Sequence, residues 1–274
     1  MPPQISPPTR NRTGPLFHGR CAFSNPSGEI GCFIYKRHWK RVFHVVRQKN
    51  LGLLIRRGKM LNDVLERITR EKIIAVIRTE NADQAVKTVQ AVMEGGVCIF
   101  EISYTIPDAQ DVIRELMKER NILVGAGTVL TLREARSAIG LGCHFVASPV
   151  GNLEMVPVCR DGNVACILGA STPSEIYTAM RGGANMVKVF PVDALGGPDY
   201  IDEILKPLPF LKIIPAGVKS YDSFKEYLSI GVEAIALGSL LTPRKHVESQ
   251  NYEAITREAK KFSSLRDDLL RKAA

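Results

Sequence analysis

The chain has 274 residues, which is enough for one large α/β domain or two smaller ones. Hydrophobic residues make up 45% of it and charged residues 24%, which is typical of a protein with a folded core and excludes a wholly disordered chain. No apolar run is long enough to span a bilayer, so the sequence predicts a soluble protein without a membrane partner.

The formal net charge of +9 is unevenly distributed. Residues 1–59 contain 12 lysines or arginines and one acid, Glu29, which gives this segment +11. The rest of the chain has 25 basic and 27 acidic residues, or −2. The folded part therefore lacks the basic excess of a nucleic-acid-binding domain, and we do not expect nucleic acid as a partner.

We interpret residues 1–59 as a basic extension and 60–274 as the domain. Prolines interrupt the extension and no period is sustained in it, so we expect it to be disordered. Three explanations remain open: an organelle transit peptide, an arm that binds nucleic acid or acidic membranes, or a start site assigned upstream of a true start at Met60. We favour the last, because the regular pattern begins just after Met60.

Six cysteines show no C-x-x-C spacing. Cys98, Cys143 and Cys166 fall at or beside apolar runs, where cysteine behaves as a small buried hydrophobe. Reduced thiols favour a cytoplasmic protein, or an organelle protein if the extension is a transit peptide. The histidines also lack metal-ligand spacing, so we expect no metal site and no cofactor.

From Leu61 on, eight apolar strand-like runs alternate with helical segments, and their starts are 20 to 26 residues apart. Such spacing is typical of a strand, a helix and two short loops. Thr131 with Glu134 and Thr172 with Glu175 predict capping boxes at two of the helices. The predicted strands are 73–78, 98–103, 122–125, 145–148, 165–169, 186–190, 212–216 and 234–237.

Eight such units predict a single-domain (β/α)₈ TIM barrel of the α/β class. An open, doubly wound sheet usually has a glycine-rich turn after its first strand, and this chain has Arg78-Thr79-Glu80-Asn81 there. Catalytic groups in these barrels come from the carboxyl ends of the strands and the loops that follow. The ends of the eight runs are therefore the places to look for a site.

Two charges lie inside apolar runs: Lys188 in the sixth and Glu101 in the second. An ammonium in such a run must be paired, reach solvent at the strand end, or be held partly neutral by burial. A neutral amine attacks carbonyls, and a nearby carboxylate can move protons. A structural ion pair remains an alternative. Strands two and six have the same parity and face each other, so both side chains could enter one interior volume.

Other strand ends carry candidate binding groups. Arg78 ends the first run, where it is either a rim cation or an anchor for a carboxylate. Thr128 follows the third run and could cap the next helix or bind substrate. Gly217, Gly238 and Ser239 follow the seventh and eighth runs, where such barrels often bind phosphate through backbone N–H groups.

Several motifs follow one another in a specific order between about Leu61 and Ser264. They are Glu101-Ile102-Ser103-Tyr104-Thr105-Ile106-Pro107-Asp108-Ala109, Gly125-Ala126-Gly127-Thr128-Val129, Ser148-Pro149, Ser171-Thr172-Pro173-Ser174-Glu175, Lys188-Val189-Phe190-Pro191 and Gly238-Ser239. In order and spacing they resemble the 2-dehydro-3-deoxy-phosphogluconate (KDPG) / 4-hydroxy-2-oxoglutarate (KHG) aldolases. Residues 1–59 resemble nothing in that family.

The resemblance implies a class I aldolase that works as a homotrimer of barrels. Lys188 matches its Schiff-base lysine and Glu101 its general acid/base. Thr128 matches a residue that contacts the carboxylate of the keto acid, and Gly217 and Ser239 match the phosphate loops. We expect Ser148, Pro149 and Gly238 to complete the substrate-binding set together with Arg78.

Two positions depart from the family pattern. Thr105 stands where some members have an arginine, and Arg78 is then the expected cation for substrate. Val218 stands where the usual turn has a second glycine, so a β-branched side chain falls beside the expected phosphate site.

The function implied is cleavage of a 2-oxo-3-deoxy sugar acid phosphate or of 4-hydroxy-2-oxoglutarate. The products are pyruvate and an aldehyde, glyceraldehyde 3-phosphate or glyoxylate. The alternatives are an aldolase for a non-phosphorylated 2-oxo acid and a non-catalytic anion-binding barrel.

Overall fold

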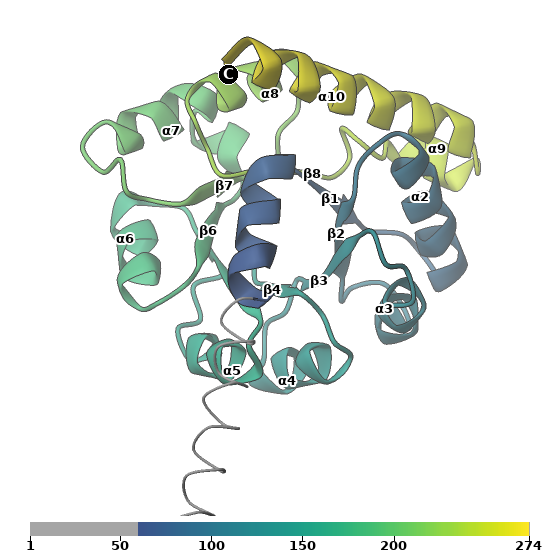
Figure 1. The fold of residues 1–274 in the computed structure, drawn as a ribbon, viewed down its shortest axis with the longest axis horizontal. Helices are drawn as coiled ribbons and strands as arrows, with labels where there is room; N and C mark the ends of the chain where they lie inside the picture. The colour runs from purple at the N-terminus through teal and green to yellow at the C-terminus, as the bar shows by residue number, and fades with distance from the viewer. Residues whose placement is uncertain (1–59, 274) are drawn as a thin grey trace, which may run out of the picture. The chain divides into compact units, whose positions relative to one another are not determined.

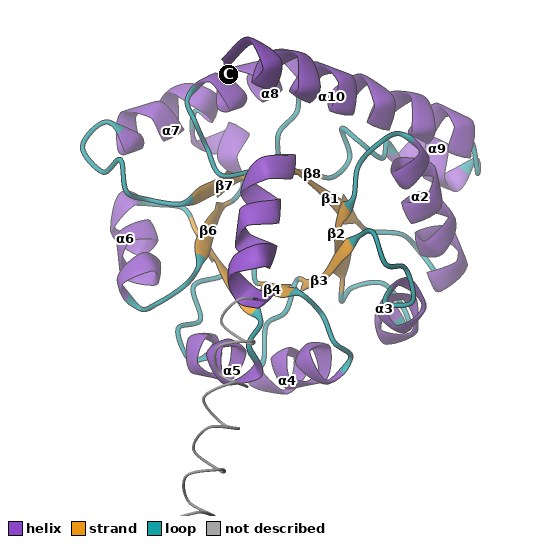
Figure 2. Ribbon diagram, viewed as in Figure 1, coloured by secondary structure: helices purple, strands orange, loops and turns teal. Residues whose placement is uncertain are grey.

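The computed structural model describes residues 60–273, and the predicted basic extension, 1–59, lies outside the described residues. Eight strands form a central ring, and helices surround it (Figures 1 and 2). The strands are β1 (Ile73–Ile77), β2 (Ile99–Ser103), β3 (Leu123–Gly127), β4 (Phe145–Ala147), β5 (Ala165–Ala170), β6 (Met186–Val189), β7 (Ile213–Pro215) and β8 (Ile235–Leu237). All eight predicted runs are strands, with ends that differ by one or two residues.

The sheet closes into a barrel. The strands are parallel and hydrogen-bonded in the order β7-β6-β5-β4-β3-β2-β1-β8. A parallel bridge between Ala216 and Ala236 joins the two ends of this order. The predicted (β/α)₈ barrel is confirmed.

The helices pack on the outside of the ring. They are α2 (Ala82–Glu94), α3 (Ala109–Leu116), α4 (Leu132–Gly140), α5 (Met155–Gly162), α6 (Pro173–Arg181), the short η1 (Val192–Leu195), α7 (Gly197–Leu205), α8 (Tyr221–Ser229), α9 (Arg244–Glu248) and α10 (Tyr252–Ala273). Among the described residues, no helix is both long and apolar enough to cross a membrane.

Both predicted capping boxes are present. The hydroxyl of Thr131 accepts a hydrogen bond from the backbone N–H of Glu134, whose carboxylate accepts one in return from the Thr131 N–H. Thr172 and Glu175 make the same pair of bonds at the start of α6. These caps satisfy backbone donors that a helix start otherwise leaves unpaired.

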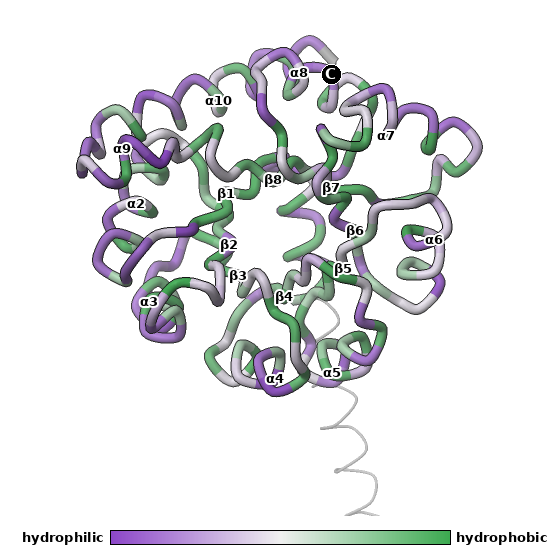
Figure 3. Tube along the Cα trace, turned by 180° about the vertical axis from the view of Figure 1, so that it is seen from behind, coloured by the Kyte–Doolittle hydropathy of each residue, from purple (hydrophilic) through white to green (hydrophobic). Residues whose placement is uncertain are grey.

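A helix over residues 60–71 covers one end of the barrel. In Figure 1 it lies across the ring of strands. Its Leu61, Val64, Leu65 and Ile68 pack against the cluster of side chains that fills the barrel interior. This end is therefore filled with apolar side chains, and the opposite end, seen from behind in Figure 3, is the end available for a site.

Alternate residues of each strand face inward, as strand geometry requires. The interior cluster contains large side chains such as Phe145 and Ile167, and small ones, Ala216 and Ala236, near the carboxyl ends of β7 and β8. The other face of each strand packs against the helices in a second, larger cluster. The small inward residues leave space at the carboxyl ends of the strands.

Candidate active site

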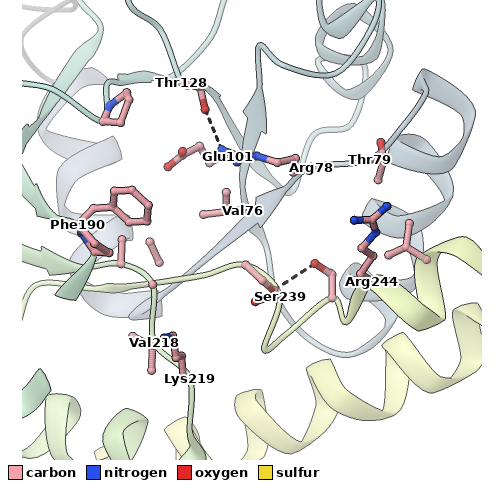
Figure 4. A pocket seen from close by; sticks show the side chains of 18 of the residues that line it. Val76, Arg78, Thr79, Glu101, Thr128, Phe190, Val218, Lys219, Ser239 and Arg244 are labelled. Atoms are coloured by element: carbon pink, nitrogen blue, oxygen red, sulfur yellow. Dashed lines mark hydrogen bonds between the residues drawn. The ribbon is translucent and has the colours of Figure 1, made fainter. Parts of the chain in front are cut away.

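A cavity of about 570 Å³ opens at the carboxyl ends of the strands. Its lining includes residues of β1, β2, β6 and β8, of the loops after β1, β3, β4, β6, β7 and β8, and of α2 and α9, and both Lys188 and Glu101 are among them. Figure 4 shows Thr128, Arg78 and Glu101 on one side of this cavity, with Val218, Lys219 and Ser239 on the other. We call it the central cavity.

Lys188 and Glu101 are in direct contact, as strand parity predicts. Lys188 Nζ lies 2.6 Å from Oε1 and 2.5 Å from Oε2 of Glu101. Both residues are buried, with exposed fractions of 7% and 2%. A buried ammonium without a partner would be strongly disfavoured, and this contact supplies the partner. The carboxylate is also placed to receive a proton from the amine.

Arg78 and Thr128 meet beside this pair. Arg78 Nη2 donates a hydrogen bond to Thr128 Oγ1 over 3.4 Å, and both residues line the central cavity. Thr128 does not cap a helix, because Thr131 occupies the cap of α4. Its backbone has a φ of 57°, a left-handed conformation that β-branched residues rarely adopt. Such conformations cluster at functional sites.

The loops after β7 and β8 reach the opposite side of the cavity. Gly217, Gly238 and Ser239 all line it. Gly217 has a φ of 87°, which only glycine adopts readily. Asp193 Oδ2 accepts a hydrogen bond of 2.9 Å from the backbone N–H of Lys219 and so ties this loop to η1.

Val218, which departs from the family pattern, lies in the turn after β7 and is mostly buried. It is 4% exposed and packs in the cluster between the strands and the helices, and it is also one of the residues that line the cavity. Figure 4 shows it at the edge of the cavity, away from Glu101 and Arg78. Most of the bulk that stands in place of the second glycine is therefore buried.

Ser148 lies apart from the other predicted residues. It is fully buried, its Oγ accepts a hydrogen bond from the Val150 N–H over 3.3 Å, and it does not line the central cavity. Phe145 and Ala147 face the barrel interior, so parity turns Ser148 toward the helices. The next residue, Pro149, does line the cavity. The alternation of inward and outward side chains along β4 was the signal that could have distinguished Ser148, which does not line the cavity, from Pro149, which does.

The cavity also has lining residues to which the sequence gave no role. Phe190 and Pro191 follow Lys188 at the end of β6, and Phe190 is 45% exposed. Lys219 and Arg244 add two cations at the mouth, and Arg244 is paired with Glu248 on α9. Phe190, Pro191 and Lys219 lie in loops and Arg244 begins the short helix α9, so no periodic pattern in the sequence could have marked them.

A buried lysine held against a buried carboxylate, at the open end of a (β/α)₈ barrel, defines a class of enzyme that uses an amine on carbonyl compounds. The comparison with known proteins agrees. The family model "KDPG and KHG aldolase" matches residues 64–258. The chain belongs to the KDPG and KHG aldolase family, and it is an aldolase, a carbon–carbon lyase of the Schiff-base class.

Individual relatives cover nearly the same segment. The 2-dehydro-3-deoxy-phosphogluconate aldolase of Haemophilus influenzae is 32% identical over 195 residues, which is 71% of this chain and 92% of that protein. The KHG/KDPG aldolase of Escherichia coli K12 is 30% identical over 194 residues, 70% of this chain and 91% of that protein.

Solved structures share the fold. A KDPG aldolase from Legionella pneumophila, with pyruvate captured as a covalent carbinolamine intermediate, has a TM-score of 0.66 and 25% identity, and the match covers 71% of this chain and 95% of that one. A designed protein cage made by fusing symmetric oligomeric domains also matches, with a TM-score of 0.60 and 26% identity over 74% of this chain and 78% of that one.

Proposed function

We propose that this chain cleaves a 4-hydroxy-2-oxo acid to pyruvate and an aldehyde, with Lys188 as the Schiff-base nucleophile and Glu101 as the general acid/base. The observation that carries the proposal is the contact of 2.5 and 2.6 Å between these two buried groups inside the central cavity. The fold, the family and the covalent pyruvate adduct of the Legionella pneumophila relative support it.

The reaction begins at the amine. Lys188 transfers a proton to Glu101, and its free Nζ attacks the C2 carbonyl of the substrate to form a carbinolamine. Glu101 returns the proton to the C2 oxygen, which leaves as water, and an iminium remains. Because both oxygens of Glu101 reach Nζ, proton transfer in either direction needs no large movement.

Cleavage follows from the iminium, which withdraws electrons from the C3–C4 bond. The C4 hydroxyl loses its proton to Glu101, directly or through a water, while the C3–C4 electron pair moves into an enamine and the aldehyde leaves. Protonation at C3 regenerates the iminium, and hydrolysis releases pyruvate and restores the amine of Lys188.

The remaining residues divide into two groups by position. Arg78 and Thr128 lie beside the reacting pair and would bind the C1 carboxylate, which is attached to the carbon that Lys188 attacks. Gly217, Gly238 and Ser239, from the loops after β7 and β8, also line the cavity and would bind the distal phosphate or carboxylate. We propose Pro149 as an apolar wall residue and assign no substrate contact to Ser148.

The substrate classes are a 2-oxo-3-deoxy sugar acid 6-phosphate and 4-hydroxy-2-oxoglutarate, which the names of the relatives specify for those proteins. Comparing kcat/KM for the phosphorylated sugar acid with kcat/KM for its non-phosphorylated analogue tests the distal anion site. A kcat/KM at least about tenfold higher for the phosphorylated compound would support the assignment of Gly217, Gly238 and Ser239.

The test of the chemistry is the intact mass of the protein after incubation with pyruvate and borohydride. Reduction of the iminium makes the link permanent, so we expect one stable adduct that maps to Lys188 and is absent without pyruvate. Folded protein that gains no mass would contradict the proposal.

We further propose a homotrimer in the cytoplasm. The family resemblance and the presence of a related domain in a cage built from symmetric oligomeric domains support an oligomer. The described residues include four free cysteines, three of them buried, as a reducing compartment permits. Light scattering on the purified chain would give the oligomeric state, and fluorescence of a tagged full-length chain would give the compartment.

A further inference from the structure

Ser103, which has no role in the mechanism above, is part of a chain of three hydroxyl groups beside the central cavity. It lies on β2 two residues after Glu101 and is fully buried. Its Oγ is 2.9 Å from Thr128 Oγ1 and 2.8 Å from Thr105 Oγ1. Thr105 is exposed, so the chain runs from the surface through Ser103 to the cavity wall at Thr128.

The number of protons on these hydroxyls restricts which of them donates and which accepts in each hydrogen bond. A hydroxyl has one proton to donate and two lone pairs to accept with. Ser103 Oγ already accepts a hydrogen bond of 3.4 Å from the backbone N–H of Thr105, which can only donate. One lone pair and one proton of Ser103 remain for the two threonine hydroxyls. The hydroxyl protons are therefore donated either from Thr105 to Ser103 and from Ser103 to Thr128, or in the reverse direction.

The two directions differ in what Thr128 offers the cavity. Arg78 occupies one lone pair of Thr128 Oγ1. If Ser103 donates to the other, both lone pairs are filled and the single proton of Thr128 is free for an acceptor in the cavity. In the reverse direction Thr128 gives its proton to Ser103 and presents only a lone pair, which repels an anion. An anionic substrate therefore selects the first direction.

We propose that Ser103 is a positioning residue that makes Thr128 a hydrogen-bond donor to the substrate's C1 carboxylate. This inference rests on the proposed function, because it takes the bound group to be the carboxylate of a 2-oxo acid. The left-handed backbone of Thr128 (φ 57°) fits it, because the bonds from Ser103 and Arg78 hold the side chain in one orientation on a disfavoured backbone. In this direction Thr105, at the solvent end, donates its hydroxyl proton to Ser103.

The test compares a ketone that has a carboxylate with one that does not. For wild type and Ser103→Ala we would measure the concentrations of pyruvate and of acetone that half-saturate borohydride trapping. We expect the pyruvate value to rise about five- to tenfold and the acetone value to stay unchanged. In turnover, KM for the 4-hydroxy-2-oxo acid should rise while kcat changes little. Equal shifts for both ketones, or no shift for pyruvate, would overturn the proposal.

Three variants complete the experiment. Ser103→Thr keeps the hydroxyl and should retain the wild-type ratio of pyruvate to acetone binding. Thr105→Val removes the hydroxyl that donates to Ser103 and so the polarisation that strengthens the bond from Ser103 to Thr128. It should weaken pyruvate binding in the same sense but less, and it tests the idea even if Ser103→Ala does not fold. Ser263→Ala is the matched control: Ser263 is also buried, its Oγ donates to the Gly95 carbonyl, and neither residue lines the cavity.

The outcomes separate this inference from the proposed function. If wild-type protein forms no adduct with either ketone, the Schiff-base assignment fails and the inference fails with it. If wild type forms the adduct and Ser103→Ala binds pyruvate as tightly as Ser263→Ala does, the chemistry stands and only the role of Ser103 is lost.

Discussion

The backbone of Gly127 lies directly against the carboxylate of Glu101. A Cβ at residue 127 would be 2.3 Å from Glu101 Oε1, which is closer than any real contact of this kind. Gly127 is on β3, next to β2 in the sheet, and pairs with Ser103. Glycine at this position therefore leaves the space in which Glu101 reaches Lys188.

Gly127→Ala should for this reason reduce turnover by displacing Glu101. A misplacement of about 1 Å can cost about 100-fold in rate, and we expect a loss of that size in kcat. Gly140→Ala is the matched control, because no atom lies within 4 Å of a Cβ added at Gly140. Steady-state kinetics of the two purified variants would decide, and equal activity would show that Glu101 tolerates the shift.

Lys188→Ala should abolish both the pyruvate adduct and turnover, because Lys188 is the only buried amine among the described residues that line the cavity, where the other lysine, Lys219, is exposed. Lys72 is the amine to compare: burial lowers its pKa, partly offset by Glu233, and its Nζ donates to the Val232 carbonyl. Peptide mapping after borohydride should find the adduct on Lys188 and none on Lys72. A full adduct in Lys188→Ala would show that another lysine forms the Schiff base.

Glu101→Gln should slow turnover by about 10²- to 10⁴-fold, the range typical of a lost general acid/base. The amide has nearly the same shape, so the protein should fold and still trap pyruvate, although more slowly. Single-turnover kinetics would separate the two steps. A variant with wild-type kcat would leave Glu101 with a structural role only.

Val218→Ala should lower stability without changing substrate preference. The side chain is buried between strands and helices, and removing it should cost about 1–3 kcal/mol in the free energy of unfolding. Val150→Ala, at a residue that is 50% exposed, should cost far less. Urea denaturation measures both. A large gain in preference for the phosphorylated substrate in Val218→Ala would show that this side chain obstructs the anion site.

Stability should fall in acid through His144. Burial lowers the pKa of this histidine from 6.5, partly offset by a hydrogen bond with the Val124 backbone. Because the folded protein binds the proton less readily than the unfolded chain, the contribution of His144 is complete above about pH 6.5 and is lost as the pH falls through the folded-state pKa. His144→Gln should flatten this part of the curve of unfolding free energy against pH.

Much of the fold could be predicted because it is encoded locally. The strand runs, their spacing and the capping boxes of Thr131 and Thr172 are patterns within short segments, and the structure has them nearly where the sequence indicates. Lys188 and Glu101 were identifiable because a charge inside an apolar run is unusual. The barrel followed from counting eight units, since the number of strands limits how the sheet can close.

The rest of the site depends on how distant strands meet. Lys188 and Glu101 are 87 positions apart, and their contact distance follows from strand register and barrel closure. The same register turns Ser148 toward the helices. It also brings Ser103, at the end of β2, into contact with Thr128, just after the neighbouring strand β3. The sequence by itself determined the barrel and pointed to Lys188 and Glu101, the two groups that we propose react, because periodicity and a charge inside an apolar run are local signals. Only the tertiary structure decided which hydroxyls and loops surround them, because those contacts exist only once the sheet has closed.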